Sequence, residues 1–139
     1  MKLNKESTVG EIMTKAPVTL RSEDILDLAD DVMTLGRIRH IPIVEAGRVV
    51  GVLSQRDLFR SALAKALGFP YNKRKTLMKA VKIQEVMSSP AITIAAGATV
   101  KEAGRVMLEK KIGCLPVVEG EALTGLVTET DVLRSIVAS

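Results

Sequence analysis

Two short stretches of the chain place a hydroxyl side chain three residues before an aspartate, where a strand-like run changes into a helix-like one. The pairs are Ser54 with Asp57 and Thr128 with Asp131. A hydroxyl and an acid at this spacing can cap a helix N-terminus, which stabilises a protein by about 1 kcal/mol. The same groups could offer acceptor oxygens to a sugar diol such as ribose, with the free N–H groups of the helix close to a phosphate.

The type of acid separates these two interpretations. The usual capping box has a Glu or Gln at the third position, because the longer side chain reaches back to the capping residue. Both stretches have the shorter Asp instead. We therefore expect Asp57 and Asp131 to contact a nucleotide rather than to serve as caps alone.

The two stretches belong to an internal repeat. A shift of 74 positions aligns residues 9–61 with residues 83–135 without a gap, and 14 of the 53 aligned positions are identical. Most of the other positions keep their character, so the chain contains two copies of one supersecondary unit. In each copy a short apolar segment leads to a strand, a helix, a hairpin of two strands and a second helix.

The hydrophobic periodicity and the turn residues give approximate bounds for these elements. The first copy is expected to have a strand near 18–20, a helix that Ser22 caps and Gly36 ends, strands at 41–44 and 48–53 around a turn at 45–47, and a helix after Ser54. The second copy is expected to have a strand near 92–94, a helix at about 100–109, strands at 115–118 and 122–127, and a helix to Val137.

Composition limits the class of protein. The chain has 139 residues, of which 47% are hydrophobic and 26% charged, as is typical of a globular unit with a real core. One Tyr, two Phe and no Trp leave little for the base stacking of many nucleic-acid binders. No apolar run approaches the roughly 18 to 20 residues of a membrane span, and the first ten residues lack the apolar part of a signal peptide, so we expect a cytoplasmic protein. The single cysteine, Cys114, fits a reducing compartment and is expected to be buried.

The repeats divide the chain into residues 1–66, a basic join at 67–81, and residues 82–139. The join contains Lys73, Arg74 and Lys75 and contributes to the net charge of +4. Such a run is most often a solvated segment, with anionic lipid, nucleic acid or a protein partner as alternatives. The sequence has no Gly-x-Gly-x-x-Gly, Walker or His-Glu-x-x-His motif, and one His with one Cys cannot build the usual catalytic or metal sets. We expect neither an enzyme nor a metal site.

Several features together resemble a tandem pair of CBS (cystathionine β-synthase) domains, a Bateman module, of the stand-alone bacterial or archaeal type. These features are the order of the elements, the segments His40-Ile-Pro-Ile-Val44 and Cys114-Leu-Pro-Val-Val118, and the strand ends Gly-hydrophobic-hydrophobic-Ser/Thr-x-x-Asp. The resemblance covers residues 9–137. It implies an α+β fold of two β-α-β-β-α repeats packed with pseudo-two-fold symmetry, frequent assembly into a homodimer, and clefts between the repeats that often bind adenine-containing ligands. In ligand-binding members the matching Asp holds the ribose, and the Ser or Thr lies beside the sugar or phosphate.

The start of each repeat would supply the remaining wall of such a cleft. Proline keeps the backbone extended in segments 15–19 and 89–93, which leaves N–H and C=O groups for the edge of an adenine. The alternative is an ordinary start of a strand. Four apolar side chains could sandwich the ring, namely Val18, Ile41, Ile92 and Leu115.

The two candidate sites differ in charge. The first has Arg39, His40 and Arg56, where the second has Gly113, Cys114 and Thr130. A phosphate needs positively charged or N–H donors, so the first site is expected to hold a nucleotide tail better. The resembling family often places a basic side chain that contacts phosphate at the position of His40.

The leading hypothesis is a regulatory, energy-sensing module that binds AMP, ADP or ATP, with S-adenosylmethionine or NAD as weaker alternatives and no obligatory cofactor. It would form a homodimer and act on an unknown protein. The alternatives are a ligand-independent dimerisation or scaffold module, in which the Ser/Thr–Asp pairs are only caps, and nucleic-acid binding through the basic join. The expected nucleotide-binding residues are Lys15, Ala16, Pro17, Val18, Thr19, Arg39, His40, Ile41, Pro42, Ser54, Arg56, Asp57, Ser89, Pro90, Ala91, Ile92, Leu115, Pro116, Thr128, Thr130 and Asp131.

Overall fold

The structure is a computed structural model that describes residues 7–66 and 78–138. The described residues divide into two compact units. The first-repeat unit contains residues 18–46, 50–66 and 78–90, and the second-repeat unit contains residues 7–17, 47–49 and 91–138. The basic cluster Lys73-Arg74-Lys75 lies outside the described residues.

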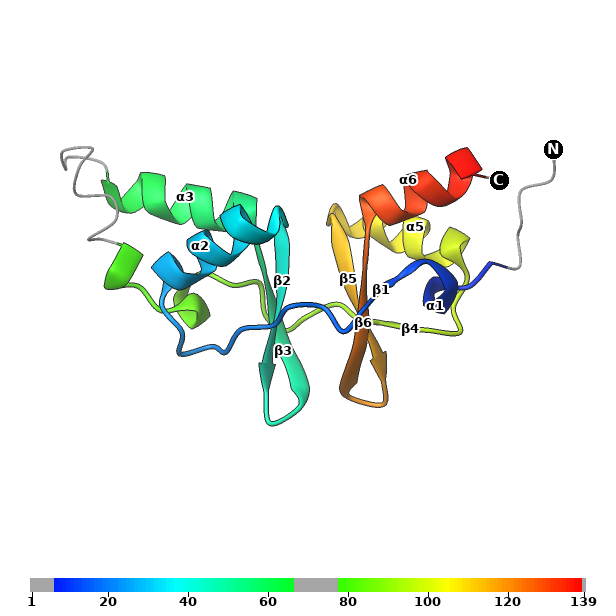
Figure 1. Cartoon of the computed structure of the whole chain (residues 1–139), viewed down its shortest axis with the longest axis horizontal. Helices are drawn as coiled ribbons and strands as arrows, with labels where there is room; N and C mark the ends of the chain where they lie inside the picture. The colour runs from blue at the N-terminus through cyan, green and yellow to red at the C-terminus, as the bar shows by residue number, and fades with distance from the viewer. Residues whose placement is uncertain (1–6, 67–77, 139) are drawn as a thin grey trace. The chain divides into compact units, whose positions relative to one another are not determined.

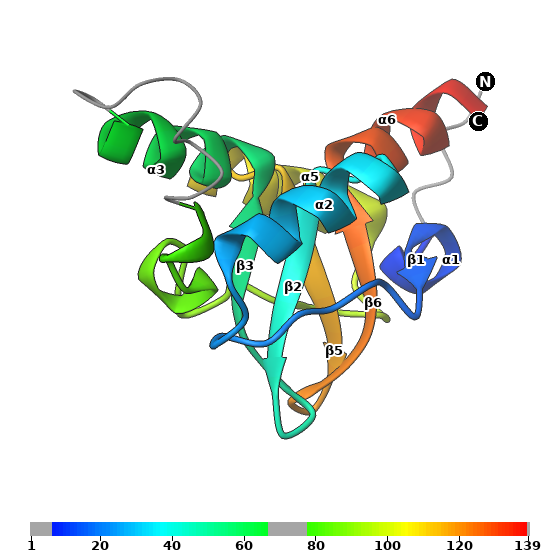
Figure 2. The same cartoon turned by 60° about the vertical axis from the view of Figure 1, so that its left-hand side comes forward.

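The first-repeat unit is a β-hairpin with two helices next to each other against it (Figures 1 and 2). Its elements are α2 (Leu26–Gly36), β2 (His40–Glu45), β3 (Arg48–Ser54), α3 (Gln55–Ala66) and the short 3₁₀ helix η2 (Ile83–Glu85). The hairpin turns at Ala46 and Gly47, which both have positive φ, as a tight two-residue turn requires. The predicted hairpin turn is confirmed.

The second-repeat unit repeats this plan, with α1 in the place of η2, and has two further short strands, β1 and β4. Its elements are α1 (Val9–Ile12), β1 (Thr14–Lys15), β4 (Ile94–Ala95), α5 (Val100–Lys110), β5 (Cys114–Glu119), β6 (Ala122–Thr128) and α6 (Glu129–Ala138). β5 and β6 pair antiparallel with Leu115 opposite Val127, β4 pairs parallel with β5, and β1 pairs antiparallel with β6. The predicted mixed α+β class is confirmed.

Each unit has its own hydrophobic core because the inward face of its hairpin packs against its helices. In the first-repeat unit Leu26 and Met33 of α2 pack with Ile41, Ile43 and Leu53. The core of the second-repeat unit has the same construction and contains Val9, Ala103, Met107, Leu115, Val117 and Val127. Cys114 is buried, as predicted. Among the described residues, no helix is long and apolar enough to cross a membrane.

The segment that leads into each repeat belongs to the unit of the other repeat. Residues 9–15 lead into the first repeat, yet Thr14 pairs with Leu126 of β6. Residues 83–89 lead into the second repeat, yet Ser88 forms a bridge with Val52 of β3. The backbone of Val9 also donates to the carbonyl of Ala98, at 2.8 Å. Each compact unit is therefore assembled from parts of both repeats.

Glycine makes this exchange of leading segments sterically possible. A Cβ built on Gly51 would lie 2.7 Å from the Sδ of Met87 and 2.8 Å from the carbonyl oxygen of Ser88. A Cβ on Gly125 would meet the Sδ of Met13 and would lie 2.9 Å from the carbonyl oxygen of Thr14. Any larger residue at either glycine would clash with the backbone of the leading segment.

Two local predictions are wrong because contacts with distant parts of the chain change the local structure. The strand expected near 18–20 is reduced to a single bridge from Leu20 to Ile43, and the strand in this region is Thr14–Lys15. Ser22 does not cap α2, whose N-cap is Ile25. Instead, the N–H and hydroxyl of Ser22 both donate to Oε1 of Glu45, at 2.9 and 2.7 Å.

Candidate functional site

The first hydroxyl–aspartate pair forms a closed ring of hydrogen bonds where β3 ends and α3 begins. The backbone N–H of Asp57 donates to Oγ of Ser54 at 3.0 Å, and the N–H of Ser54 donates back to Oδ2 of Asp57 at 3.2 Å. This is a reciprocal capping box. The N–H of Gln55 donates to the carbonyl of Arg39 at 2.8 Å, so the start of α3 is tied to the residue just before β2.

The second pair has the same geometry at the start of α6. The N–H of Asp131 donates to Oγ1 of Thr128 at 3.3 Å, and the N–H of Thr128 donates to Oδ2 of Asp131 at 2.8 Å. The N–H of Glu129 donates to the carbonyl of Gly113 at 3.0 Å, which matches the Gln55–Arg39 bond 74 positions earlier. The two helix starts are thus local copies of each other.

Both carboxylates accept the returning N–H bond, although the usual capping box has the longer Glu or Gln at this position. Each uses one oxygen, Oδ2, for this purpose. Oδ1 of Asp131 lies 3.9 Å from Nη1 of Arg134. Within the described part of the chain, Oδ1 of Asp57 accepts no hydrogen bond. Capping and ligand contact therefore do not exclude each other, since the first pair keeps one acceptor oxygen outside the box.

Two exposed arginines belong to the segments that meet at the first helix start. Arg39, whose carbonyl contacts Gln55, has an exposed side chain, and so does Arg56 in the first turn of α3. His40, at the first position of β2, is half-buried and has an interaction within the chain. The Gln55–Arg39 bond thus joins the segment of Arg39 and His40 to the helix start that carries Arg56.

The equivalent surroundings in the second-repeat unit are less basic. Gly113 and Thr130 stand where Arg39 and Arg56 are. An open pocket of about 240 Å³ lies between α1 and α6, lined by Ile12, Asp131, Arg134, Ser135 and Ala138. Pockets for ligands of drug size usually have volumes of about 300 to 1,000 Å³. This pocket is therefore too small to enclose a whole nucleotide.

The four apolar residues expected to sandwich an adenine ring are in two different environments. Ile41 and Leu115 have no exposed surface and belong to the two cores, together with the buried Pro42 and Pro116. Their side chains cannot touch a ligand in this structure, so the ring-binding set is corrected to exclude them. Val18 and Ile92 are exposed.

The two predicted wall segments are each divided between the units. Lys15, Ala16 and Pro17 lie in the second-repeat unit, where Lys15 pairs with Gly125 of β6. Val18 and Thr19 belong to the first-repeat unit. Ser89 and Pro90 lie in the first-repeat unit, and the Oγ of Ser89 donates to the carbonyl of Val50 at 2.9 Å, whereas Ala91 and Ile92 lie in the other unit. The Ser54–Asp57 pair therefore lies in the same unit as Ser89 and Pro90, which end the segment that leads into the second repeat. The Thr128–Asp131 pair lies in the same unit as Lys15, Ala16 and Pro17, which belong to the segment that leads into the first repeat.

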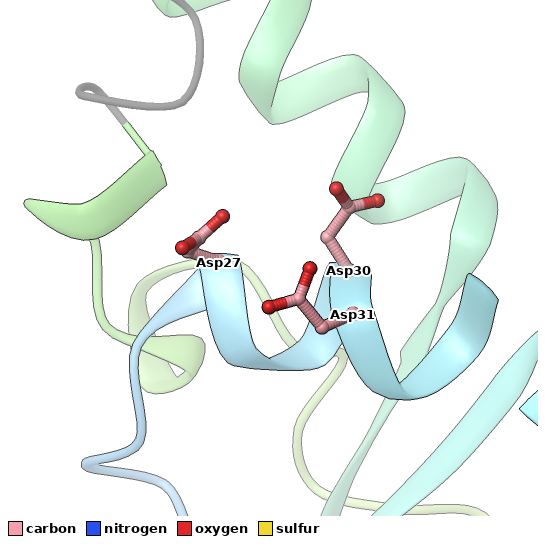
Figure 3. Close-up of side chains that lie close together, drawn as sticks. All are labelled: Asp27, Asp30 and Asp31. Atoms are coloured by element: carbon pink, nitrogen blue, oxygen red, sulfur yellow. The ribbon is translucent and has the colours of Figure 1, made fainter. Parts of the chain in front are cut away.

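Sequence reasoning missed an acidic group on α2. Oxygens of Asp27, Asp30 and Asp31 lie within 4.8 Å of one another, and all three side chains project from the same helix (Figure 3). The signal in the sequence is the spacing of three and four residues, which places the three acids on neighbouring helix positions. Each of the three also has an interaction within the chain. Surface acids often group in this way without an ion, and this group alone does not indicate a metal site.

Comparison with known proteins gives consistent matches over nearly the whole chain. The family model for the CBS domain matches twice, at residues 9–64 and 83–138. The uncharacterized protein MJ1404 of Methanocaldococcus jannaschii is 28% identical over 139 aligned residues, which cover 97% of this chain and 33% of that protein. This chain spans about a third to a half of the length of the first curated relatives.

Solved structures show the same fold. The protein AcuB from Vibrio cholerae superposes with a TM-score of 0.81 at 32% identity, covering 96% of this chain and 93% of that one. The CBS domain pair of protein MJ0100, solved in complex with 5′-methylthioadenosine and S-adenosyl-L-methionine, has a TM-score of 0.78 at 28% identity and covers 95% of this chain and 97% of that one. The similarity extends over both repeats.

Proposed function

The chain belongs to the CBS domain family, and from this premise we propose that it is a non-catalytic regulatory module that binds an adenine-containing nucleotide at the start of α3. The observation that carries the proposal is the state of Asp57. Its Oδ2 closes the capping box, and its Oδ1 is left for a ligand. A ribose diol donates two hydroxyl hydrogens, which a carboxylate oxygen accepts well because bonds to charged groups are stronger than neutral ones.

The charges near this helix start support a phosphorylated ligand. Arg39 and Arg56 are both exposed, and Arg56 follows Gln55, whose N–H donates to the carbonyl of Arg39. The first turn of a 12-residue helix adds N–H groups and the positive end of the helix dipole. We therefore propose AMP, ADP or ATP as the ligand class. The adenosyl ligands of the MJ0100 domain pair support an adenosine moiety.

The start of α6 would bind a nucleotide more weakly. Arg134 already lies near Oδ1 of Asp131, and Thr130 carries no charge where Arg56 does. We propose that this second motif serves mainly as a cap, or takes an adenosine compound without a phosphate tail. A cytoplasmic location stays a prediction from the sequence.

A thermal-shift panel tests whether a ligand binds. The panel contains adenosine, AMP, ADP, ATP, S-adenosylmethionine and NAD, each in excess over the protein. A true ligand at a hundredfold excess over its dissociation constant stabilises the folded state by about 2.7 kcal/mol. AMP, ADP or ATP should raise the melting temperature more than adenosine. If no compound raises it, nucleotide binding is rejected.

Calorimetric titration of two matched variants then locates the site. Asp57→Asn keeps an oxygen for the capping box but removes the charge, so nucleotide affinity should fall roughly tenfold or more. Asp131→Asn makes the same change in the other repeat and should cost less than threefold, since a difference of about 0.6 kcal/mol corresponds to that factor. Equal or reversed losses would place the ligand elsewhere.

A scaffold function is the second candidate, and the exposed face of α6 supports it. None of the residues of α6, all of which the structure describes, is buried. Leu133 and Val137 are large apolar residues with 61% and 84% of their surface exposed. Exposed apolar groups of this kind often mark a surface of association. We propose that the chain associates with a second copy of itself, which light scattering after size-exclusion chromatography would detect as a doubled mass.

A further inference from the structure

The methionines of the two leading segments differ in exposure from the other methionines that the structure describes. Met33, Met78 and Met107 are buried, with 3%, 1% and 5% of their surface exposed. Met13 and Met87 are partly exposed, and each packs against the core of one unit. Of the described methionines, these two are therefore the ones that a small solute can reach without any opening of the fold.

Each of these two methionines fills a place that a glycine leaves open. The Sδ of Met87 lies 2.7 Å from the point that a Cβ on Gly51 would occupy, and its Cγ lies 3.2 Å from that point. The Sδ of Met13 contacts the corresponding point on Gly125. Each thioether therefore packs on the backbone of a strand, β3 in one unit and β6 in the other. An unbranched, apolar sulfur group suits such a narrow place.

The same methionines lie next to the bonds that attach the leading segments. Ser88, which follows Met87, exchanges two backbone hydrogen bonds with Val52, at 2.9 and 3.0 Å. The residue that follows Met13 pairs with Leu126, in the two-residue strand β1. Both strand pairings are short, so the packing of the neighbouring methionine contributes much of what holds each segment in place.

We infer that Met13 and Met87 are sites of reversible oxidation by a peroxide, and that oxidation to the sulfoxide releases the leading segments. A lone pair of the thioether sulfur attacks one oxygen of hydrogen peroxide, and the O–O bond breaks as the S–O bond forms. The proton of the attacked oxygen passes to the leaving hydroxide, so the second product is water. The sulfur loses two electrons and the peroxide gains them. Enzymes that reduce methionine sulfoxide reverse the change.

The sulfoxide does not suit the place of the thioether. Its S–O bond is strongly polar, and its oxygen accepts hydrogen bonds. The carbonyl oxygen of Ser88 lies 2.8 Å from the Cβ point of Gly51, and that of Thr14 lies 2.9 Å from the Cβ point of Gly125. Both are acceptors and have no hydrogen to donate. A polar group without a donor is unfavourable in such a place, so the oxidised side chain turns to solvent and the segment loses its packing.

Peptide mass spectrometry tests the sites of oxidation. The native chain is treated with hydrogen peroxide and digested with trypsin, which puts Met13, Met33, Met78, Met87 and Met107 in five different peptides. Met13 and Met87 should be oxidised at least about tenfold faster than the three buried methionines, because a buried sulfur reacts only when the fold opens. The chain unfolded in guanidinium chloride is the control, in which all five should react at similar rates. Similar rates in the native chain would overturn the inference.

Hydrogen exchange and thermal denaturation test the release of the segments. The amides of Val52 and Ser88 should exchange at least about tenfold faster in the oxidised chain, because they donate to each other's carbonyl groups. The melting temperature should fall by about 5 °C or more. Reduction by enzymes specific for each of the two sulfoxide epimers should restore both values. An oxidised chain with unchanged exchange and an unchanged melting temperature would show that the segments are not released.

Leucine variants separate these two methionines from every other oxidised residue. Met13→Leu/Met87→Leu keeps apolar side chains of similar volume and retains Cys114, and peroxide should leave its melting temperature unchanged. Met33→Leu/Met107→Leu is the matched control, which keeps both proposed sites and should lose as much stability as the unmodified sequence. If peroxide still destabilises the first variant, another residue is responsible and the inference fails. If circular dichroism shows that the first variant is unfolded, the reductase treatment of the unmodified sequence decides, since these enzymes do not reduce an oxidised cysteine.

Release of the segments should also weaken nucleotide binding, a step that rests on the proposed function. Ser89 and Pro90 follow Met87 and lie in the same unit as Asp57. Calorimetric titration with AMP and with ATP, before and after oxidation, should give at least about a threefold loss of affinity. Equal affinities in the two states would overturn this step alone. A chain that binds neither nucleotide in either state would reject the proposed function, while the oxidation sites would stand on the mass spectrometry.

Discussion

Gly51 lies against Met87, and Gly125 lies against Met13, so the same close contact occurs once in each unit between partners of identical type. The exposed positions of the two units differ instead. Asp31 corresponds to Arg105, and Ser22 with its bond to Glu45 corresponds to an alanine that can make no such bond. The repeats have kept the contacts where two backbones meet, because no other side chain fits there. They differ where a side chain faces solvent, a ligand or another protein.

The two capping boxes are equal in their own hydrogen bonds but differ in the residues around them. Ser54 with Asp57 and Thr128 with Asp131 form the same local hydrogen bonds, so the difference between the two helix starts comes from their neighbours. Exposed Arg39 and Arg56 belong to the segments that meet at the first, and Arg134 lies near Oδ1 of Asp131 in the second. Two helix starts with the same hydrogen bonds can thus differ in the ligands that we propose for them, because their neighbours differ.

The largest expected effect tests the shared interior. Gly51→Ala and Gly125→Ala should each lower the free energy of unfolding by about 2 to 3 kcal/mol, because the new Cβ overlaps a backbone carbonyl that cannot rotate away. Gly97→Ala is the control, since a Cβ on Gly97 would meet nothing within 4 Å. Urea denaturation of the three variants measures the effect. A loss at only one of the first two glycines would break the equivalence of the two units.

A smaller effect tests the equivalence of the two helix starts. Ser54→Ala and Thr128→Ala should each cost about 1 kcal/mol of stability, because each removes the oxygen that accepts the N–H of an aspartate. Gln55→Ala, exposed in the first turn of α3, should be close to neutral. Thermal denaturation followed by circular dichroism gives the three values. A cost for Ser54 alone would mean that the second box contributes nothing to stability.

The smallest effect sharpens the difference between the repeats. Hydrogen bonds from the hydroxyl and N–H of Ser22, with a further contribution from Arg21, hold the pKa of Glu45 below its ordinary value of 4.5. A lowered pKa in the folded state contributes stability that is present above the unfolded pKa and is lost as the pH falls through the folded pKa. Glu45→Gln should therefore be less stable than the unmodified chain at neutral pH, and the difference should shrink below pH 4.5.

Glu119→Gln provides the comparison for Glu45, since Ala95 and Ala96 occupy the positions of Arg21 and Ser22 in the second repeat. Because alanine side chains cannot donate to Glu119, this variant should have nearly the stability of the unmodified chain at neutral pH. Unfolding in urea at a series of pH values measures both differences. If Glu45→Gln lowers the free energy of unfolding by the same amount at every pH, the hydrogen bonds of Ser22 do not depend on the charge of the carboxylate.

Much of the fold could be predicted because it depends on local chemistry. The hairpin at Ala46 and Gly47 follows from turn residues, α5 follows from hydrophobic spacing, and both boxes follow from hydroxyl and acid at a fixed distance. The start of α2 could not be predicted in the same way. Ser22 has the chemistry of a cap, but Glu45, distant in sequence, accepts both of its hydrogen bonds. The contact with Glu45 holds Ser22 away from the helix start, which lies at Ile25.

The sequence by itself determined that two copies of one unit exist, where each helix begins after its hairpin, and which positions carry charge. It could not determine which leading segment belongs to which unit. Met13 and Met87 are identical, as are Gly51 and Gly125, so a contact within a repeat and a contact between repeats have the same local chemistry. Only the tertiary structure decides between them, because the choice depends on how the chain passes from one unit to the other. The same holds for Ile41 and Leu115, whose apolar character suits a ligand or a core equally, and which the packing of each unit places in the core.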